Sequence, residues 1–212
     1  MNKSQLSNFI TKYTLGGEIK STKWTSDGNS LSTRFISGDK SVVGSVNLNK
    51  FTHLKPCELG VYNTAQLSSL LSVLGDDIDV NLSKSGDKFI SMEFTDTKRK
   101  TKSKYMLSDL SVIPTPPELK NLPDSFELGI KVDPYFVSTF ISGKGALSEA
   151  ETFTILTENG ETKIVIGYAS IASNRVTIPV ETTKGGEIEP ISFNANMFAS
   201  ILNANKDCES AT

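Results

Sequence analysis

The sequence predicts an α+β protein made of two similar halves. Two periods alternate along it: apolar residues at every second position, typical of half-buried strands, and apolar residues at i, i+3, i+4 and i+7, typical of amphipathic helices. The stretch 58–74 holds both, because Leu59 and Val61 alternate with a charged residue and a glycine, and a helical stripe follows. Asn63 between them is a suitable N-cap, and Gly75 is a suitable helix stop. This unit is therefore a strand, a cap and a short helix.

The same helix template occurs at four places, which indicates a duplication. In each, an Asn or Asp is followed by apolar residues four, seven and eight positions later. The four origins are Asn2, Asn63, Asp133 and Asn194, spaced by 61, 70 and 61 residues. Such a rhythm is expected when each of two domains carries two helical units. Chance recurrence of capped helices is the alternative.

The elements of the first half are bounded by turn residues. Residues 27–29 and 38–39 suit tight hairpins, and residues 84–87 and 96–98 also carry turn-forming types. The glycine pair 16–17 ends the first helix. The expected elements are a helix at 3–13, strands at 19–25, 30–37 and 40–47, the unit at 58–74, and strands at 78–83, 88–95 and 101–107.

A proline-rich segment separates the halves. Four prolines within 114–123 remove backbone donors and favour extended conformations, so a stiff connector is expected at 112–125, between domains at 1–111 and 126–212. The second half then begins again. Its expected elements are a strand at 126–132, a helix at 133–142, strands at 151–157, 161–168 and 174–180, a turn at 185–186, a strand at 190–193 and a helix at 194–204.

Composition indicates a soluble cytoplasmic protein. A chain of 212 residues with 37% hydrophobic content suffices for one large or two small cores, and a net charge of −2 argues against general polyanion binding. Cys57 and Cys208 lie far apart with no signal peptide before them, so free thiols in a reducing compartment are expected. No apolar run reaches the length of a membrane span.

The sequence carries no catalytic or metal-binding motif, so a non-enzymatic protein without cofactor or metal is expected. His53 is the only histidine, and with Cys57 it supplies at most half of a metal site. Residues 77–81 imitate the start of a calcium loop, but Leu82 stands where glycine is required. Phosphate-binding loops and the nucleophile elbow of hydrolases are also missing.

One basic tract stands out, residues 98–104 (Lys-Arg-Lys-Thr-Lys-Ser-Lys). Its four lysines occupy alternate positions and are expected on one face of a strand. Lysines on an edge strand ordinarily prevent unwanted pairing. Phosphate contact and complementarity to an acidic partner edge are the alternatives.

In its organisation the chain resembles a DNA sliding clamp, most closely the trimeric clamp of T4-like bacteriophages. The likeness rests on two domains of two helix-and-strand units joined by a proline-containing connector. Two segments carry the local match: 59–77 is similar to the helix segment of the phage clamps, and 112–117 (Val-Ile-Pro-Thr-Pro-Pro) to their pre-linker segment. The resemblance is diffuse and covers most of the chain. It implies the clamp fold, with antiparallel sheets outside and two helices per domain on the inner face.

The resemblance also implies a function in DNA replication. A clamp is a homotrimeric ring and polymerase accessory protein that encircles duplex DNA without sequence preference; for a phage it works in the host-cell cytoplasm. The DNA polymerase and clamp loader are expected to dock in an apolar groove beside the connector, and strand 101–107 to pair with 174–180 of the neighbour, stopping before Pro179. The expected surface residues are Lys3, Lys12, Lys144 and Lys206 facing DNA, Val112, Ile113, Leu119 and Leu122 lining the groove, and Lys102, Lys104, Tyr105, Leu107, Arg175, Val176 and Ile178 at the subunit interface.

The second half departs from the family pattern in its length. About 48 residues of the first domain follow Asn63, whereas 18 residues follow Asn194, so about three strands are missing. We expect a second domain that is incomplete at its C-terminus, with a natively smaller half as the rival. Two other functions stay open. One is a virion or other structural protein with the same duplication, and the other is a single-strand nucleic-acid binder, for which Tyr105 is the only aromatic residue near the basic tract.

Overall fold

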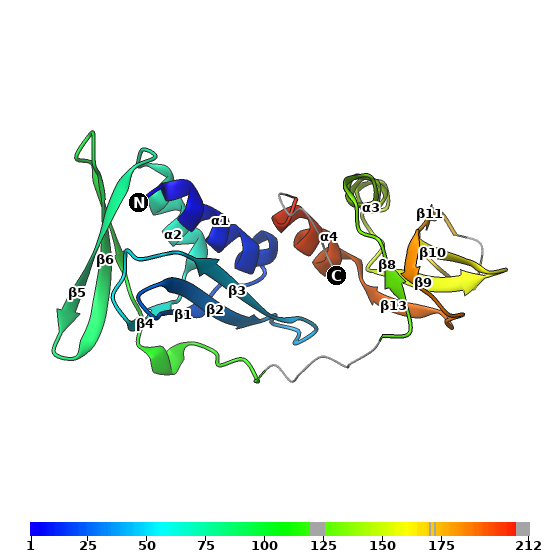
Figure 1. Cartoon of the computed structure of the whole chain (residues 1–212), viewed down its shortest axis with the longest axis horizontal. Helices are drawn as coiled ribbons and strands as arrows, with labels where there is room; N and C mark the ends of the chain where they lie inside the picture. The colour runs from blue at the N-terminus through cyan, green and yellow to red at the C-terminus, as the bar shows by residue number, and fades with distance from the viewer. Residues whose placement is uncertain (119–125, 170, 172, 207–212) are drawn as a thin grey trace. The chain divides into compact units, whose positions relative to one another are not determined.

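The computed structural model of the chain describes residues 1–118, 126–169, 171 and 173–206. The chain divides into two compact units, Met1–Leu119 (unit 1) and Lys120–Thr212 (unit 2), with the division inside the predicted connector. Each unit combines helices with antiparallel strands (Figure 1). The α+β class predicted from the sequence is confirmed.

Unit 1 has two antiparallel sheets and a pair of helices in contact with each other. The sheets have the strand orders β3-β2-β1-β4 and β5-β6-β7. In chain order the elements are α1 (Lys3–Thr14), η1 (Leu15–Gly17), β1 (Thr22–Ser26), β2 (Ser30–Ile36), β3 (Val43–Asn49), β4 (Cys57–Val61), α2 (Thr64–Ser72), β5 (Ile78–Ser85), β6 (Lys88–Asp96), β7 (Lys102–Met106) and η2 (Leu110–Val112).

Unit 2 repeats the first part of this arrangement. Its four-stranded sheet has the order β11-β10-β9-β13, which matches β3-β2-β1-β4 element for element, and a two-stranded sheet pairs β12 with β8. The predicted strand 126–132 is reduced to β8, and β12 was not predicted. The elements are β8 (Gly129–Ile130), α3 (Pro134–Ala146), β9 (Thr152–Glu158), β10 (Glu161–Ile166), β11 (Val176–Pro179), β12 (Thr182–Lys184), β13 (Ile191–Asn194) and α4 (Ala195–Ala204).

All four predicted helix caps are present, and each works in the same way. The side-chain oxygen of each cap accepts a hydrogen bond from a backbone N–H of the first helical turn, which otherwise has no partner inside the helix. The donors are Ser4 for Asn2, Gln66 for Asn63, Phe136 for Asp133 and Met197 for Asn194. The repeat seen in the sequence is therefore a repeat of local structure.

Removing a cap is expected to destabilise its own unit. Asn63→Ala leaves the Gln66 N–H without its side-chain acceptor, so we expect a loss of about 1 kcal/mol of unfolding free energy. Urea denaturation followed by the fluorescence of Trp24, the single tryptophan, measures unit 1. Asn81→Ala, on β5 and away from any helix end, is the control. Equal midpoints for the two variants would contradict the capping role.

The core of unit 1 centres on aromatic side chains from α1 and β1. The Trp24 indole lies edge-on to Phe9 at 5.5 Å and donates its N–H to the Tyr13 hydroxyl. Tyr13 in turn donates to Thr64 at the start of α2. Burial raises the pKa of Tyr13 far above its usual value, so this hydroxyl stays neutral. The hydrogen-bonded chain fixes both helices against the sheet.

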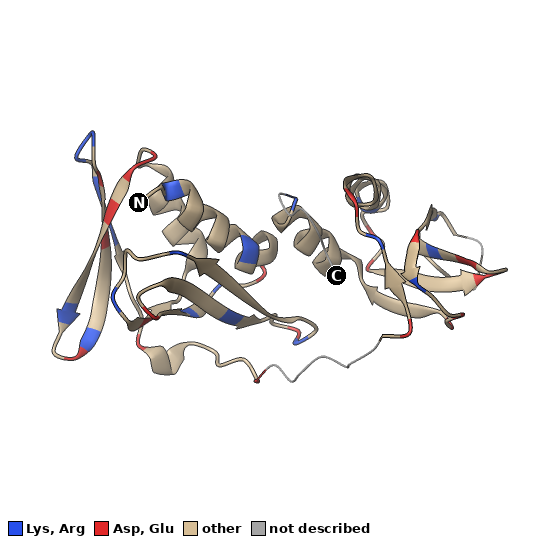
Figure 2. Ribbon diagram, viewed as in Figure 1, with Lys and Arg blue, Asp and Glu red and all other residues tan. Residues whose placement is uncertain are grey.

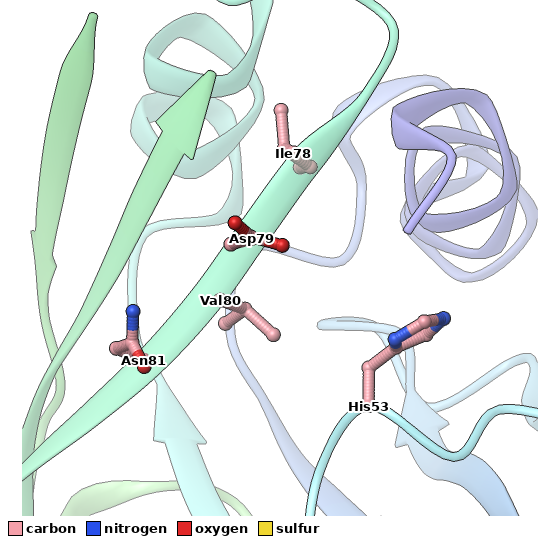
Figure 3. A pocket seen from close by; sticks show the side chains of 5 residues that line it. All are labelled: His53, Ile78, Asp79, Val80 and Asn81. Carbon is pink, nitrogen blue, oxygen red and sulfur yellow. The ribbon is translucent and has the colours of Figure 1, made fainter. Parts of the chain in front are cut away.

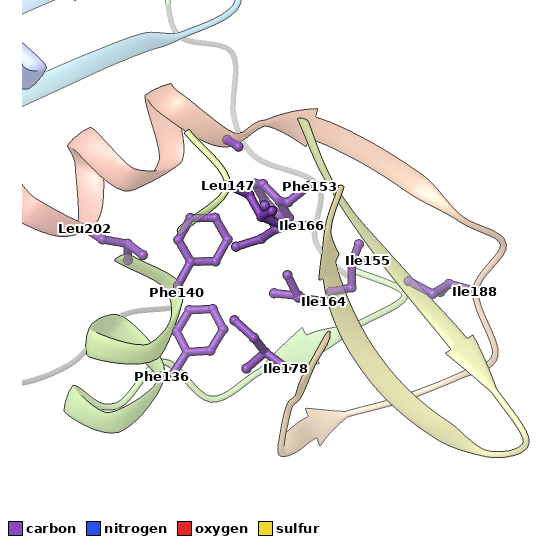
Figure 4. Close-up of a cluster of buried hydrophobic side chains, with 11 residues drawn as sticks. Phe136, Phe140, Leu147, Phe153, Ile155, Ile164, Ile166, Ile178, Ile188 and Leu202 are labelled. Carbon is purple, nitrogen blue, oxygen red and sulfur yellow. The ribbon is translucent and has the colours of Figure 1, made fainter. Parts of the chain in front are cut away.

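The core of unit 2 is made by α3 lying across the four-stranded sheet. Figure 4 shows Phe136 and Phe140 directed from α3 toward isoleucines of β10 and β11. Phe140 is fully buried, with ring centroids 5.1 Å from Phe153 and 4.9 Å from Phe198. Strand β9 and helix α4 therefore meet on this one ring.

The two units differ in how their corresponding strands β4 and β13 are covered. In unit 1 the free edge of β4 is closed, because the Ser108 N–H donates to the Gly60 oxygen and Ile113 packs beside that glycine. In unit 2, β13 is exposed along its whole length, including Ile191 and Phe193. Within the described residues, unit 2 contains no counterpart of β5-β6-β7.

Candidate nucleic-acid interface

The four α-helices carry no acidic residue. The chain has 24 Asp and Glu among 212 residues, about one in nine, yet none lies within α1, α2, α3 or α4 (Figure 2). Acidic side chains in the first turn of a helix are ordinarily favourable, by about 0.3–1 kcal/mol each. The only carboxylate at the start of these helices is the cap Asp133, whose oxygen is occupied by the Phe136 N–H.

The solvent-facing side of α1 and α2 is made of small uncharged polar residues. On α1, Ser4, Gln5, Asn8 and Thr11 are exposed and line a shallow depression of about 450 Å³. On α2, Gln66 and three serines are exposed. A face of hydroxyls and amides without negative charge can lie against a polyanion without repulsion.

Two of the four lysines predicted to face DNA instead donate hydrogen bonds to backbone oxygens at helix ends. The Lys3 ammonium donates to the Leu74 oxygen, just past the end of α2. The Lys144 ammonium is buried and donates to the oxygens of Leu147 and Ser148, at 3.4 and 2.7 Å, near the end of α3. A cation is favourable at this negative end of a helix. Lys144 therefore does not face outward, which corrects the expectation.

The other two lysines also lie near helix ends. Lys12 is half-buried in the last turn of α1, and Lys206 is exposed just after α4. With Lys3 half-buried, the cationic charge on the helical faces is sparse. Hydroxyl and amide groups supply most of the surface there.

The basic tract is split between a turn and a strand. Only Lys102 and Lys104 share the exposed face of β7, because Lys100 takes a left-handed conformation with φ +60° and ends the alternation. The expectation of four lysines on one strand face is therefore wrong. Lys98, Arg99 and Lys100 form the turn between β6 and β7, and we call them the basic turn.

Strands β7 and β11 are both edge strands of their sheets in the described part of the chain. At the two ends of β7, the Leu107 N–H donates to the Ile90 oxygen and the Thr101 oxygen accepts the Asp96 N–H. Because hydrogen bonding alternates along an antiparallel strand, the odd-numbered residues of β7 bond to β6. The backbone N–H and C=O groups of Lys102, Lys104 and Met106 therefore point away from β6 and are unpaired. These groups are available to a further strand.

On β11 the free backbone groups are fewer. The Val180 N–H donates to the Thr162 oxygen at the start of β10. By the same alternation, the backbone of Ile178 bonds to β10, and the backbone groups of Thr177 and Pro179 point away from the sheet. Pro179 has no N–H to donate, which limits any added ladder to its N-terminal side.

The side chains predicted for the subunit interface divide into exposed and buried groups. Arg175, Lys102 and Lys104 are exposed, and Leu107 and Val176 are half-buried. Tyr105 and Ile178 are core residues with exposures of 2% and 3%, and the Tyr105 hydroxyl accepts the N–H of the cap Asn63. Their side chains are thus removed from the predicted interface.

The first part of the connector lies along the sheet of unit 1. Lys23 on β1 donates to the Thr115 hydroxyl, and Arg34 on β2 donates to the Pro117 oxygen. Val112 is exposed, whereas Ile113 is buried against β4 and belongs to the core rather than to an open groove. The predicted groove residues Leu119 and Leu122 lie outside the described residues.

A separate shallow cavity of about 320 Å³ lies between His53 and residues Ile78–Asn81 of β5 (Figure 3). Burial and the charge of the N-terminal amino group lower the pKa of His53, and Asp79 opposes them. One imidazole and one carboxylate do not complete a metal site, and the described residues contain no cluster of three potential ligands. The cavity offers no recognisable chemistry.

No protein-family model matches the chain, and no curated protein matches it significantly. The class that the fold defines is an α+β protein with an internal repeat and antiparallel sheets. Among the described residues, no helix is long and apolar enough to cross a membrane. Cys57 is a free, half-buried thiol whose pKa is raised by burial, and Cys208 lies outside the described residues.

Proposed function

We propose that this protein is the subunit of a DNA sliding clamp, a bacteriophage processivity factor that encircles duplex DNA and tethers the replicative polymerase. The observation that carries the proposal is the exclusion of acidic residues from all four helices. A ring that slides must avoid both repulsion by phosphates and strong attachment to them. Uncharged polar faces with a few lysines satisfy both requirements.

The edge strands support a head-to-tail assembly. We propose that β7 of one subunit pairs with β11 of the next, which closes a homotrimer of six units with about twelve helices around the hole. Lys102 and Lys104 protect β7 against pairing with another β7. The exposed acidic residues Glu181, Glu187 and Glu189 follow β11. Glu181 is paired with Lys131 in its own unit, so Glu187 and Glu189 are the proposed partners of opposite charge for the lysines.

The groove for the polymerase and clamp-loader tails is proposed beside the connector. Val112 is the described apolar residue with a free surface there, and Ile113 beneath it holds the segment to β4. The tail is expected to bind as an extended or turn-like peptide anchored by one or two large side chains.

The proposal predicts that retention on DNA depends on topology. The protein is loaded onto nicked circular DNA with its clamp loader, washed at high salt, and the circle is then linearised. We expect retention on the circle and loss of most of the protein from the linear form, since weak phosphate contacts do not hold it. A structural protein or a single-strand binder would be retained equally on both forms, which would refute the proposal.

A further inference from the structure

The basic turn lies beside the segment that joins α2 to β5, and the start of α1 is bonded to the same segment. The Thr97 N–H donates to the Asp77 oxygen at 3.0 Å, and the Lys3 N–H donates to the Asp76 oxygen at 2.7 Å. The start of α1 and the basic turn are thus bonded to adjacent residues of one segment. That segment directly follows α2.

The turn is held in one conformation by the buried side chain of Asp96. Its carboxylate accepts the N–H groups of Arg99, Gly75 and Lys98 at 2.7, 2.8 and 2.8 Å. These hydrogen bonds, that of Arg99 first, hold the pKa of Asp96 below its usual value, and the Arg99 charge lowers it further. Charged side chains on a fixed turn lose little backbone freedom on binding a ligand.

Within the described part of the chain, two of the three cations of the basic turn have no salt bridge. Lys98 lies 3.4 Å from the Asp77 carboxylate, in an exposed pair of small energetic weight. Arg99 and Lys100 are exposed and make no salt bridge to any described residue. Asp76 lies nearby, on the segment between α2 and β5. The positive charges without a salt bridge are therefore those of Arg99 and Lys100 in the turn itself.

We infer that the basic turn is a second DNA-contact site, in which Arg99 and Lys100 bind phosphates of duplex DNA and Asp96 positions them. This inference rests on the proposed function, and it adds two exposed cations of the turn to the few lysines near the helical faces. The contact is sequence-independent because it reaches only the phosphate backbone.

The test measures binding of the full chain to a short labelled linear duplex between about 50 and 200 mM salt. For Arg99→Ala/Lys100→Ala we expect roughly tenfold weaker binding at the low-salt end and a salt slope reduced by about 0.9 for each phosphate that the variant no longer neutralises. The matched control is Lys55→Ala/Lys84→Ala, which removes two exposed charges elsewhere on unit 1. If the variant and the control pair had the same salt slope, the inference would be overturned. The same result is expected if the turn binds an acidic protein rather than DNA.

A second variant separates positioning from charge. Asp96→Ala removes a negative charge and the acceptor of all three hydrogen bonds, so a purely electrostatic effect would tighten DNA binding, whereas loss of the fixed turn weakens it. We expect weaker binding with a folded protein by circular dichroism, and tighter binding would overturn the positioning role. Linear DNA needs no ring, so this assay is independent of topology. If the wild type failed to bind the duplex at all the inference would fail, whereas equal retention on linear and circular DNA would refute only the clamp.

Discussion

Gly60→Ala is expected to detach the start of the connector from unit 1. A Cβ at this position would overlap the backbone oxygen of Ser108, at 2.3 Å, and would touch the Ile113 side chain at 3.4 Å. The substitution therefore breaks the bridge in which Ser108 donates to the Gly60 oxygen. Overpacking costs about 1–3 kcal/mol. Complete exposure of an isoleucine costs about 1.5–3 kcal/mol, and here the exposure is partial. The expected loss of unfolding free energy is therefore roughly 3 kcal/mol.

Urea denaturation followed by Trp24 fluorescence measures this loss, and amide exchange at Ser108 and Ile113 locates it. Gly38→Ala is the control, because a Cβ there meets nothing within 4 Å. We expect the control to stay within about 0.5 kcal/mol of wild type. Unchanged protection of the Ser108 amide in Gly60→Ala would show that the bridge survives, and the proposed support of the connector would be wrong.

Local patterns in the sequence were sufficient to predict the repeat. The caps at Asn2, Asn63, Asp133 and Asn194 and the strand and helix types follow from short-range rules, because a side-chain oxygen two or three residues before a free N–H needs no distant partner. These features depend on neighbours in sequence.

The errors have two sources: short turns that the helix and strand periods do not predict, and one contact with a distant part of the chain. Lys144 reads as a surface cation, but the turn after α3 brings two carbonyl oxygens to its ammonium. Ile113 reads as a groove residue, but it fills the space left by Gly60, far away in sequence. The split of the basic tract at Lys100 depends on Asp96 bonding the turn. A glycine in a strand and an aspartate before a basic turn are signals that could have indicated these contacts.

Phe140→Ala is expected to unfold unit 2 selectively. The ring is fully buried and contacts Phe136, Phe153 and Phe198, so truncation leaves a cavity where α3, α4 and the sheet meet. The expected cost is about 3–5 kcal/mol, a large part of the roughly 5–15 kcal/mol that stabilises an ordinary domain. Because β13 is already exposed, the surrounding elements have little other packing to compensate.

The measurement is amide exchange across both units together with Trp24 fluorescence. We expect protection to be lost in β9, β10 and α4, while the Trp24 transition, which reports unit 1 alone, keeps its wild-type midpoint. Tyr135→Ala is the matched control, an aromatic truncation on the same helix at a residue that is 75% exposed, and its effect should stay within about 0.5 kcal/mol. Equal losses of protection in the two variants would show that the aromatic cluster does not hold unit 2 together. A simultaneous shift of the Trp24 transition would show that the two units unfold as one, because a cavity in one independent core leaves the other unchanged.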